Sequence, residues 1–127
     1  MDFSERLDLY LEGGMIDQND VDDVLAIINM FNEEYGYQLT EENASTFIAH
    51  ICSAYFRNKT EEEIEELPEV VLNELLGLNT YKKSVEILDR LKEVTHNQLN
   101  ETEQNYALLH INNLIAGFEN SEETEFK

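Results

Sequence analysis

The stretch TEENASTFIAHICSAYFR, residues 40–57, decides the fold class. Thr40 is a good helix N-cap, and Glu41 and Glu42 after it suit the positive end of a helix dipole. Apolar residues then recur every three or four positions, which places them on one helical face: Ala44, Phe47, Ile48, Ile51, Ala54 and Tyr55. The stretch therefore predicts an amphipathic helix with one face in a core.

The same helical period recurs along the rest of the chain, which has a single proline. No segment shows the sustained alternation of polar and apolar residues that is typical of a strand. Five further helical segments are expected, at about residues 2–12, 20–35, 60–77, 80–95 and 100–118. The sequence thus predicts an all-α fold, a compact bundle of about five to six helices.

Two of these segments carry more detailed expectations. The helix at 20–35 has a predicted inward stripe of Val21, Val24, Leu25, Ile28, Phe31 and Tyr35. In the segment at 60–77, Thr60 and Glu63 form a possible capping box, and the acidic run 61–66 is interpreted as a solvated helix start. This short helix is expected to be interrupted or restarted at Pro68.

The chain is expected to form one domain, because 127 residues fit a single core. Its core is expected within about residues 20–118, and residues 119–127 are expected to be a flexible acidic tail. We expect a cytoplasmic protein, because the N-terminus lacks the character of a secretory signal. No apolar run is long enough to cross a membrane, and the single cysteine, Cys52, excludes an internal disulfide.

The charge of the chain argues against direct binding to nucleic acid. Eight basic residues face 28 acidic ones, and the formal net charge is −20. Nucleic-acid affinity depends largely on Lys and Arg side chains that displace counterions from phosphates. An acidic surface repels phosphate backbones and anionic lipid headgroups, so we expect no nucleic-acid or membrane partner.

Two histidines lie at the border of an apolar stripe. His50 and Arg57 are two helical turns apart on one face of the predicted helix at 40–57. Glu103, Tyr106 and His110 share one face of the last helix. If the two helices pack against each other, we expect the two imidazoles within roughly 10 Å of each other, at a partly accessible seam.

A purely structural interpretation of these residues remains open. A single histidine beside an apolar face is usually a satisfied boundary residue. Glu103 is also explained as the partner of an Asn100 helix cap, and Arg57 as a cation at a helix C-terminus. Spacing alone therefore indicates only a helical bundle with two boundary histidines.

Two motifs resemble the signatures of a known family, the PTS regulation domain. HICSAYFR, residues 50–57, is similar to the first signature: a histidine, an aliphatic residue, then Ala54 and Arg57 at the fourth and seventh positions after it. ETEQNYALLHI, residues 101–111, resembles the second, with a tyrosine three positions and a histidine seven positions after Glu103. The resemblance covers roughly residues 20–118.

The resemblance implies a regulatory role. Members of this family are helical modules, usually in tandem, in antiterminators and activators of sugar operons. Their histidines accept phosphoryl groups from the histidine phosphocarrier protein or from sugar-permease B domains, and phosphorylation changes dimer packing. By resemblance, His50 and His110 are the phosphoacceptors, Arg57, Glu103 and Tyr106 support them, and the protein is a homodimer.

The sequence departs from the family pattern in its organisation. It holds one module rather than two, and the residues before Asp20 are too few for an RNA-binding domain. We therefore expect a phosphorylation-responsive module of the sugar phosphotransferase system that acts by docking to another protein. The alternative is a helical adaptor or assembly protein that keeps the fold without being phosphorylated.

Other chemistry finds little support in the residues. His50 and Cys52 point about 200° apart on a helix, so they suit neither a nucleophile–base pair nor a metal pair. The nearest match to a helical Glu-x-x-His metal motif is Glu93 to His96, at an expected helix end. His96 is interpreted as a solvent-facing residue near a helix C-terminus. We expect no enzyme activity, no cofactor and no metal.

Overall fold

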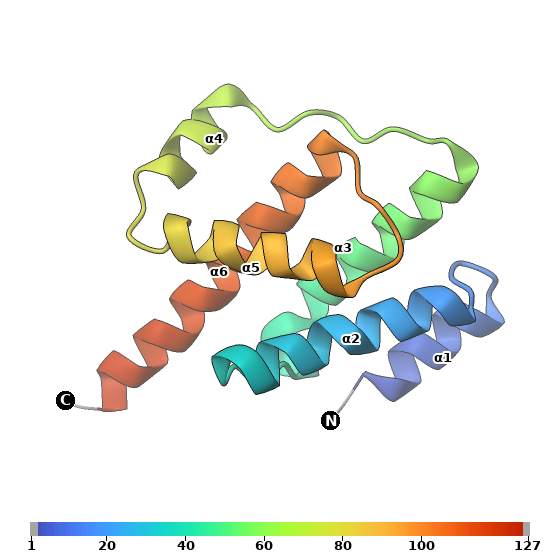
Figure 1. Ribbon diagram of the computed structural model, residues 1–127, viewed down its shortest axis with the longest axis horizontal. Helices are drawn as coiled ribbons and strands as arrows, with labels where there is room; N and C mark the ends of the chain where they lie inside the picture. The colour runs from blue at the N-terminus through green and yellow to red at the C-terminus, as the bar shows by residue number, and fades with distance from the viewer. Residues whose placement is uncertain (1–2, 126–127) are drawn as a thin grey trace.

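This computed structural model describes residues 3–125, with side chains as far as Glu119. Within these residues the fold is all-α, as predicted, with six helices and no strand (Figure 1). The helices are α1 (Ser4–Glu12), α2 (Gln18–Tyr35), α3 (Glu41–Thr60), α4 (Glu69–Leu76), α5 (Tyr81–Val94) and α6 (Glu101–Glu125).

Side-chain caps set the starts of α2 and α3. The Asp17 carboxylate accepts a hydrogen bond from the Asp20 backbone N–H, and the Asp20 carboxylate accepts one from the Asp17 N–H, which fixes the start of α2. Thr40 and Asn43 form the same reciprocal box at the start of α3, so the predicted Thr40 cap is confirmed. Gly36 ends α2 in the left-handed conformation, with φ of 73°.

The acidic segment after α3 is not a helix start, and the predicted Thr60–Glu63 capping box is wrong. Helix α3 runs to Thr60, and Glu61 ends it in the left-handed conformation, with φ of 58°. Residues 61–68, which we call the acidic linker, cross from α3 to α4 without helical structure (Figure 1). Glutamates three and four residues apart would repel each other in a helix, and Pro68 disfavours helical backbone before it.

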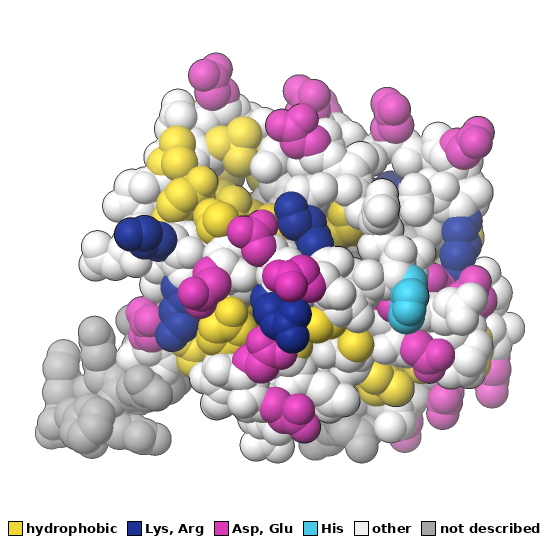
Figure 2. Space-filling view, viewed as in Figure 1, with side chains coloured by type: hydrophobic (Ala, Val, Ile, Leu, Met, Phe, Trp, Pro, Cys, Tyr) yellow, Lys and Arg dark blue, Asp and Glu magenta, His cyan; other side chains and the backbone are white. Residues whose placement is uncertain are grey.

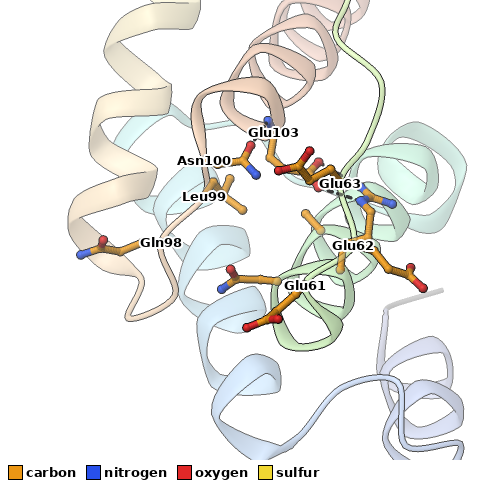
Figure 3. Close-up of a pocket in the computed structure, with 10 residues that line it drawn as sticks. Glu61, Glu62, Glu63, Gln98, Leu99, Asn100 and Glu103 are labelled. Carbon is orange, nitrogen blue, oxygen red and sulfur yellow. Dashed lines mark hydrogen bonds and ion pairs between the residues drawn. The ribbon is translucent and has the colours of Figure 1, made fainter.

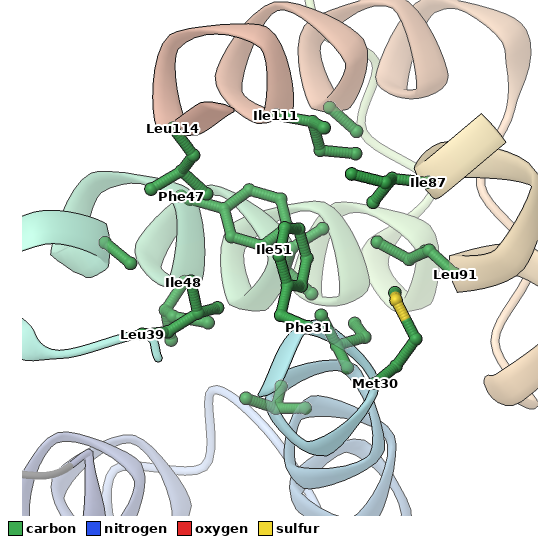
Figure 4. Close-up of a cluster of buried hydrophobic side chains, with 14 of the residues drawn as sticks. Met30, Phe31, Leu39, Phe47, Ile48, Ile51, Ile87, Leu91, Ile111 and Leu114 are labelled. Atoms are coloured by element: carbon green, nitrogen blue, oxygen red, sulfur yellow. The ribbon is translucent and has the colours of Figure 1, made fainter. Parts of the chain in front are cut away.

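Four helices enclose the core. Helix α2 packs against α3 and α5, and α6 also packs against α3 and α5, while α1 lies on α2 and α4 lies on α6. Side chains from all four converge in the middle (Figure 4). The predicted inward face of α3 is confirmed, because all six residues of its stripe are buried. This packing brings the two histidine-bearing helices, α3 and α6, side by side.

The predicted inward face of α2 is partly wrong. Leu25 is 46% exposed, whereas Ile27 and Met30, outside the predicted stripe, are buried with Val24 and Phe31. Helix α2 contacts α1, α3 and α5, so a wide arc of its surface is covered and the apolar pattern alone does not define one face.

A buried polar contact fixes α5 against α6. The Ser84 hydroxyl is fully buried and donates to the Thr80 carbonyl oxygen at 2.8 Å. The Thr80 hydroxyl also hydrogen-bonds with the side chain of Asn112, which is 4% exposed. Because buried polar groups need partners, these bonds favour one register between the two helices.

Helix α6 is longer than its sequence pattern predicts. Its helical backbone continues to Glu125, so the predicted end near Phe118 is wrong. The side chains of the expected tail beyond Glu119 lie outside the described residues. Within residues 3–125, no helix combines the length and the apolar character that a membrane span requires.

Candidate functional site

The two candidate histidines meet between α3 and α6. The ring centroids of His50 and His110 are 4.9 Å apart, so the predicted proximity is confirmed. Tyr106 stacks with the His50 ring at 5.9 Å. Arg57 and Glu103 complete this group, and we call the five residues the histidine seam. Packing of two amphipathic helices has thus brought together every candidate residue of the two motifs.

The Arg57 guanidinium forms a two-pronged ion pair with Glu103. Its Nε donates to Glu103 Oε2 at 2.6 Å and its Nη2 to Oε1 at 2.9 Å. The Glu103 side chain is only 4% exposed, and this contact raises the pKa of Arg57. Asn100 accepts a hydrogen bond from the Glu103 N–H at 2.8 Å, so the expected cap of α6 is present as well. The Arg57 guanidinium is therefore already paired with Glu103.

His50 lies deeper than the sequence pattern predicts. Its side chain is 7% exposed, and its Nε2 is buried without a hydrogen-bond partner among the described residues. Glu103 Oε1 lies 3.9 Å from that nitrogen, beyond hydrogen-bonding distance. Burial and the nearby His110 lower the pKa of His50 to about 4. At neutral pH this ring is uncharged.

His110 is the accessible member of the pair. It is half-buried, and burial lowers its pKa below the usual value. Its ring lines an open hollow of about 290 Å³ together with Asn43, Thr46, Phe47, Asn113 and Leu114. The expectation of a partly accessible seam thus holds for His110, whereas the His50 side chain is almost sealed. The polar residues Asn43 and Thr46 were not singled out in the sequence, although both precede His50 by whole turns of α3.

A second hollow, of about 310 Å³, is lined by both members of the Arg57–Glu103 pair (Figure 3). Three glutamates of the acidic linker line it, Glu61, Glu62 and Glu63. These carboxylates make this hollow unfavourable for anions.

Tyr106 connects the seam to the acidic linker. Its hydroxyl donates a hydrogen bond to the Glu65 carbonyl oxygen at 2.7 Å, while its ring stacks with His50. The linker is otherwise exposed and carries little regular structure. One side chain thus contacts both the buried histidine and the segment that leads to α4.

A cluster of carboxylates on α2 was missed in the sequence. Asp20 and Asp23 are each 1% exposed, and Asp23 accepts hydrogen bonds from the backbone N–H groups of His96 and Asn97. Asp20 binds Lys59 and accepts a hydrogen bond from the Asn97 side chain. The available signal was helical spacing, because Asp20 lies seven residues before the core residue Ile27 and Asp23 lies four before it.

Within the described residues, no group of three or more His, Cys, Asp or Glu side chains is placed to hold a metal ion. Cys52 is buried, and burial raises the pKa of its thiol to about 12. A thiol with this pKa stays protonated near neutral pH and is a poor nucleophile.

Comparison with known proteins explains the two motifs. The model of the PRD domain family matches residues 25–114, a span that contains the whole histidine seam. The chain belongs to the PRD domain family. This family is regulatory rather than catalytic.

This PRD domain is similar to the uncharacterized protein YhfY of Escherichia coli strain K12, with 27% identity over 106 residues. The match covers 84% of this chain and 88% of that protein. No solved structure matches the chain.

The lowered pKa of His50 predicts a pH-dependent stability. Between pH 6.5, the ordinary histidine value, and about 4, the unfolded chain binds more protons at this position than the folded protein does. The stability contributed by the neutral ring is complete above pH 6.5 and is lost as the pH falls toward about 4. As the pH falls through this range, we expect the free energy of unfolding to decrease with a slope approaching ~1.4 kcal/mol per pH unit.

Urea unfolding followed by circular dichroism, from about pH 7.5 to about pH 5, measures this slope. His50→Gln should reduce this slope, because the glutamine side chain does not titrate, whereas the lowered pKa of His110 keeps a smaller slope in place. A wild-type stability that does not change over this range would contradict the assignment of a buried neutral imidazole.

The buried carboxylate of Glu103 predicts a large cost for losing its partner. Arg57→Ala should destabilise the fold by ~3–5 kcal/mol, because it leaves a buried charge without compensation. The double change Arg57→Met and Glu103→Leu should recover most of this loss. Arg90→Ala is the control: its pair with Glu34 is exposed on both sides, so the change should cost at most ~1 kcal/mol. If urea titrations give equal losses of unfolding free energy for Arg57→Ala and Arg90→Ala, the Arg57–Glu103 pair stabilises the fold no more than an exposed pair does.

Proposed function

We propose that this PRD domain is a phosphorylation-responsive regulatory module of the sugar phosphotransferase system, acting in the cytoplasm. His110 and His50 accept phosphoryl groups, and the packing of the histidine seam then controls association with another protein. The observation that carries this proposal is the pairing of two neutral imidazoles, with ring centroids 4.9 Å apart, beside a buried ion pair. The module itself is neither an enzyme nor a nucleic-acid-binding protein.

His110 is the entry point for the phosphoryl group. Phosphoryl transfer to an imidazole needs a neutral ring nitrogen that the donor can reach. His110 meets both conditions, because its pKa is lowered and its ring lines the open hollow. The ring nitrogen forms a bond to phosphorus while the bond between phosphorus and the donor side chain breaks. The electron pair of that bond stays on the donor side chain, which takes up a proton, and the attacked His110 ring loses its remaining proton to water.

Phosphorylation at the seam places charge where it can change the packing. A phosphoryl group adds nearly two negative charges, and Arg57 is the cation of the seam. At ~6 Å and an effective dielectric constant of ~20, each pair of unit charges interacts by roughly 3 kcal/mol. Reversing a two-state equilibrium takes ~5.5 kcal/mol. A phosphoryl dianion that competes with Glu103 for Arg57 therefore has an interaction energy large enough to shift the histidine seam between two packing arrangements.

His50 is the second acceptor in this scheme. Its Nε2 has no hydrogen-bond partner among the described residues, but the ring is sealed and needs local opening before a donor can reach it. Release of the Arg57–Glu103 pair by a phosphate on His110 is one route to that opening. The donors that fit the family are the histidine phosphocarrier protein and sugar-permease B domains.

A helical adaptor that is not phosphorylated is the second candidate function. The observation in its favour is that the His50 side chain is only 7% exposed, which is the environment of a structural histidine. Hydrophobic side chains also gather over α4 on the face shown in Figure 2, where both acidic and basic side chains border them. Val70, Leu76 and Leu78 in this region are between 47% and 63% exposed. Such a surface serves protein contacts in either function.

The phosphoryl-transfer proposal predicts different effects for the two histidines. The purified protein is incubated with phosphoenolpyruvate, the general phosphotransferase proteins and candidate permease B domains, and acid-labile phosphate is mapped by mass spectrometry. His110→Ala should abolish labelling of both seam histidines, because His110 is the accessible acceptor. His50→Ala should leave labelling of His110 in place. Both variants should remain helical.

Several outcomes would contradict this scheme. Absence of phosphate from both histidines with every donor would favour the adaptor. Labelling of His50 at the wild-type rate in His110→Ala would show that entry does not depend on His110. Loss of the helical fold in either variant would support a structural role for that histidine.

We also infer that the module forms a homodimer, as the family resemblance implies and as its uncovered apolar side chains favour. Leu9, Leu25 and Val70 are between 46% and 68% exposed. Multi-angle light scattering at micromolar concentrations should give twice the mass of the 14.8 kDa chain. A monomer across this range, before and after phosphorylation, would rule out the dimer.

A further inference from the structure

His96 lies in the turn between α5 and α6, away from the histidine seam. Its ring is 89% exposed, and its Nδ1 lies 3.0 Å from Oδ1 of Asp23. The Asp23 side chain, in contrast, is only 1% exposed. An exposed imidazole is thus attached through one nitrogen to a buried carboxylate from a helix 73 residues away in sequence.

Asp23 is held rigidly as an acceptor. It receives hydrogen bonds from the His96 N–H at 3.0 Å, from the Asn97 N–H at 2.9 Å and from the Asn97 side chain at 2.8 Å. Burial opposes its ionisation, but these hydrogen bonds lower the pKa of Asp23 below its ordinary value. An ionised carboxylate only accepts hydrogen bonds, so Nδ1 of a neutral His96 carries the proton. The lone pair is then on Nε2, which points away from this contact on an exposed ring.

This arrangement meets two requirements that the seam histidines do not meet together. A phosphoryl acceptor needs a reachable nitrogen and a partner that orients the other nitrogen. His50 is sealed and its Nε2 has no hydrogen-bond partner among the described residues, while His110 is half-buried. Among the histidines that the structure describes, only His96 has a ring that is both exposed and oriented by a hydrogen-bond partner.

The surroundings of His96 hold a cation. A hollow of about 320 Å³ beside the ring is lined by Asp17, Asn19, Asp20, Lys59, His96 and Asn97. The Lys59 ammonium pairs there with Asp20 and lies 3.2 Å from Asp17. It offsets part of the repulsion that these carboxylates exert on a phosphoryl group.

We propose that His96 is a third phosphoryl acceptor of this protein, which reacts at Nε2 with donors that carry a phosphorus–nitrogen bond, and that Asp23 is its positioning residue. This site is separate from the histidine seam and does not depend on the function proposed for it. The reaction is the same group transfer on a ring that needs no local opening.

The transfer balances with a simple donor such as phosphoramidate. The Nε2 lone pair forms the new nitrogen–phosphorus bond, the phosphorus–nitrogen bond of the donor breaks, and ammonia leaves after it takes up a proton. The attacked ring carries a positive charge until its Nδ1 proton is lost to water. The Asp23 carboxylate, 3.0 Å away, stabilises that charge as it develops.

The test uses potassium phosphoramidate at about pH 8, where free histidine is neutral. Phosphohistidine at each of the three positions is followed by mass spectrometry, and its isomer by phosphorus NMR, in the native and in the urea-unfolded wild-type chain. We expect native His96 to react at Nε2 and roughly tenfold faster than in the unfolded chain, below the 10²–10⁴ typical of a full acid–base partner. Exposure alone cannot produce this increase, because unfolding exposes the ring further.

Variants separate orientation from exposure. Asp23→Asn should reduce the rate at His96 to that of the unfolded chain and mix the two isomers. Asp22→Asn is the matched control, because Asp22 is an exposed neighbour that loses the same charge, and it should keep the native rate. If Asp23→Asn does not fold, the comparison of native with urea-unfolded wild-type protein tests the proposal by itself. Native His96 that reacts no faster than unfolded His96, or a native ring whose nitrogen NMR shows the proton on Nε2, would overturn the proposal.

Discussion

The pairing of Glu103 with Arg57 is the constraint on which the arrangement of the site depends. A carboxylate that is 4% exposed is tolerable only with a partner that satisfies both of its oxygens. The apolar faces of α3 and α6 would pack in several neighbouring registers, since hydrophobic contact is not directional. The two-pronged ion pair selects one of them. In that register His50 and His110 face each other, and Tyr106 lies on the buried ring.

The proximity of the two histidines could be predicted from the sequence for a definite physical reason. Helical spacing assigns His50 and Arg57 to one face, and the apolar residues beside them require that face to be covered. The difference in burial between the histidines could not be predicted in the same way. The difference in burial depends on Tyr106, on the acidic linker and on the exact docking of the helices. The apolar period of a single helix predicts none of these. Boundary position alone made His50 look more accessible than it is.

Two of the features that were not predicted from the sequence, the roles of Asp23 and His96, involve partners far apart along the chain. Asp23 carries no local signal of its role, because the N–H groups that it accepts from belong to the turn before α6. The acidic linker failed as a predicted helix because repulsion among its glutamates outweighs the propensity of each one. His96 was interpreted as an ordinary residue at a helix end, which correctly described its exposure. Its contact with Asp23 appears only when α2 is placed against that turn.

Tyr106 acts as a rigid lever between the interior and the surface. A phenol ring has no internal joint, so its hydroxyl, bonded to the Glu65 carbonyl, moves whenever the ring moves against His50. A displacement of the buried imidazole therefore acts, through the Tyr106 ring, on a hydrogen bond to the segment that precedes α4. Helix α4 packs mainly on α6 and presents uncovered apolar side chains. The position of that surface is thus coupled mechanically to the state of a ring that the solvent barely reaches.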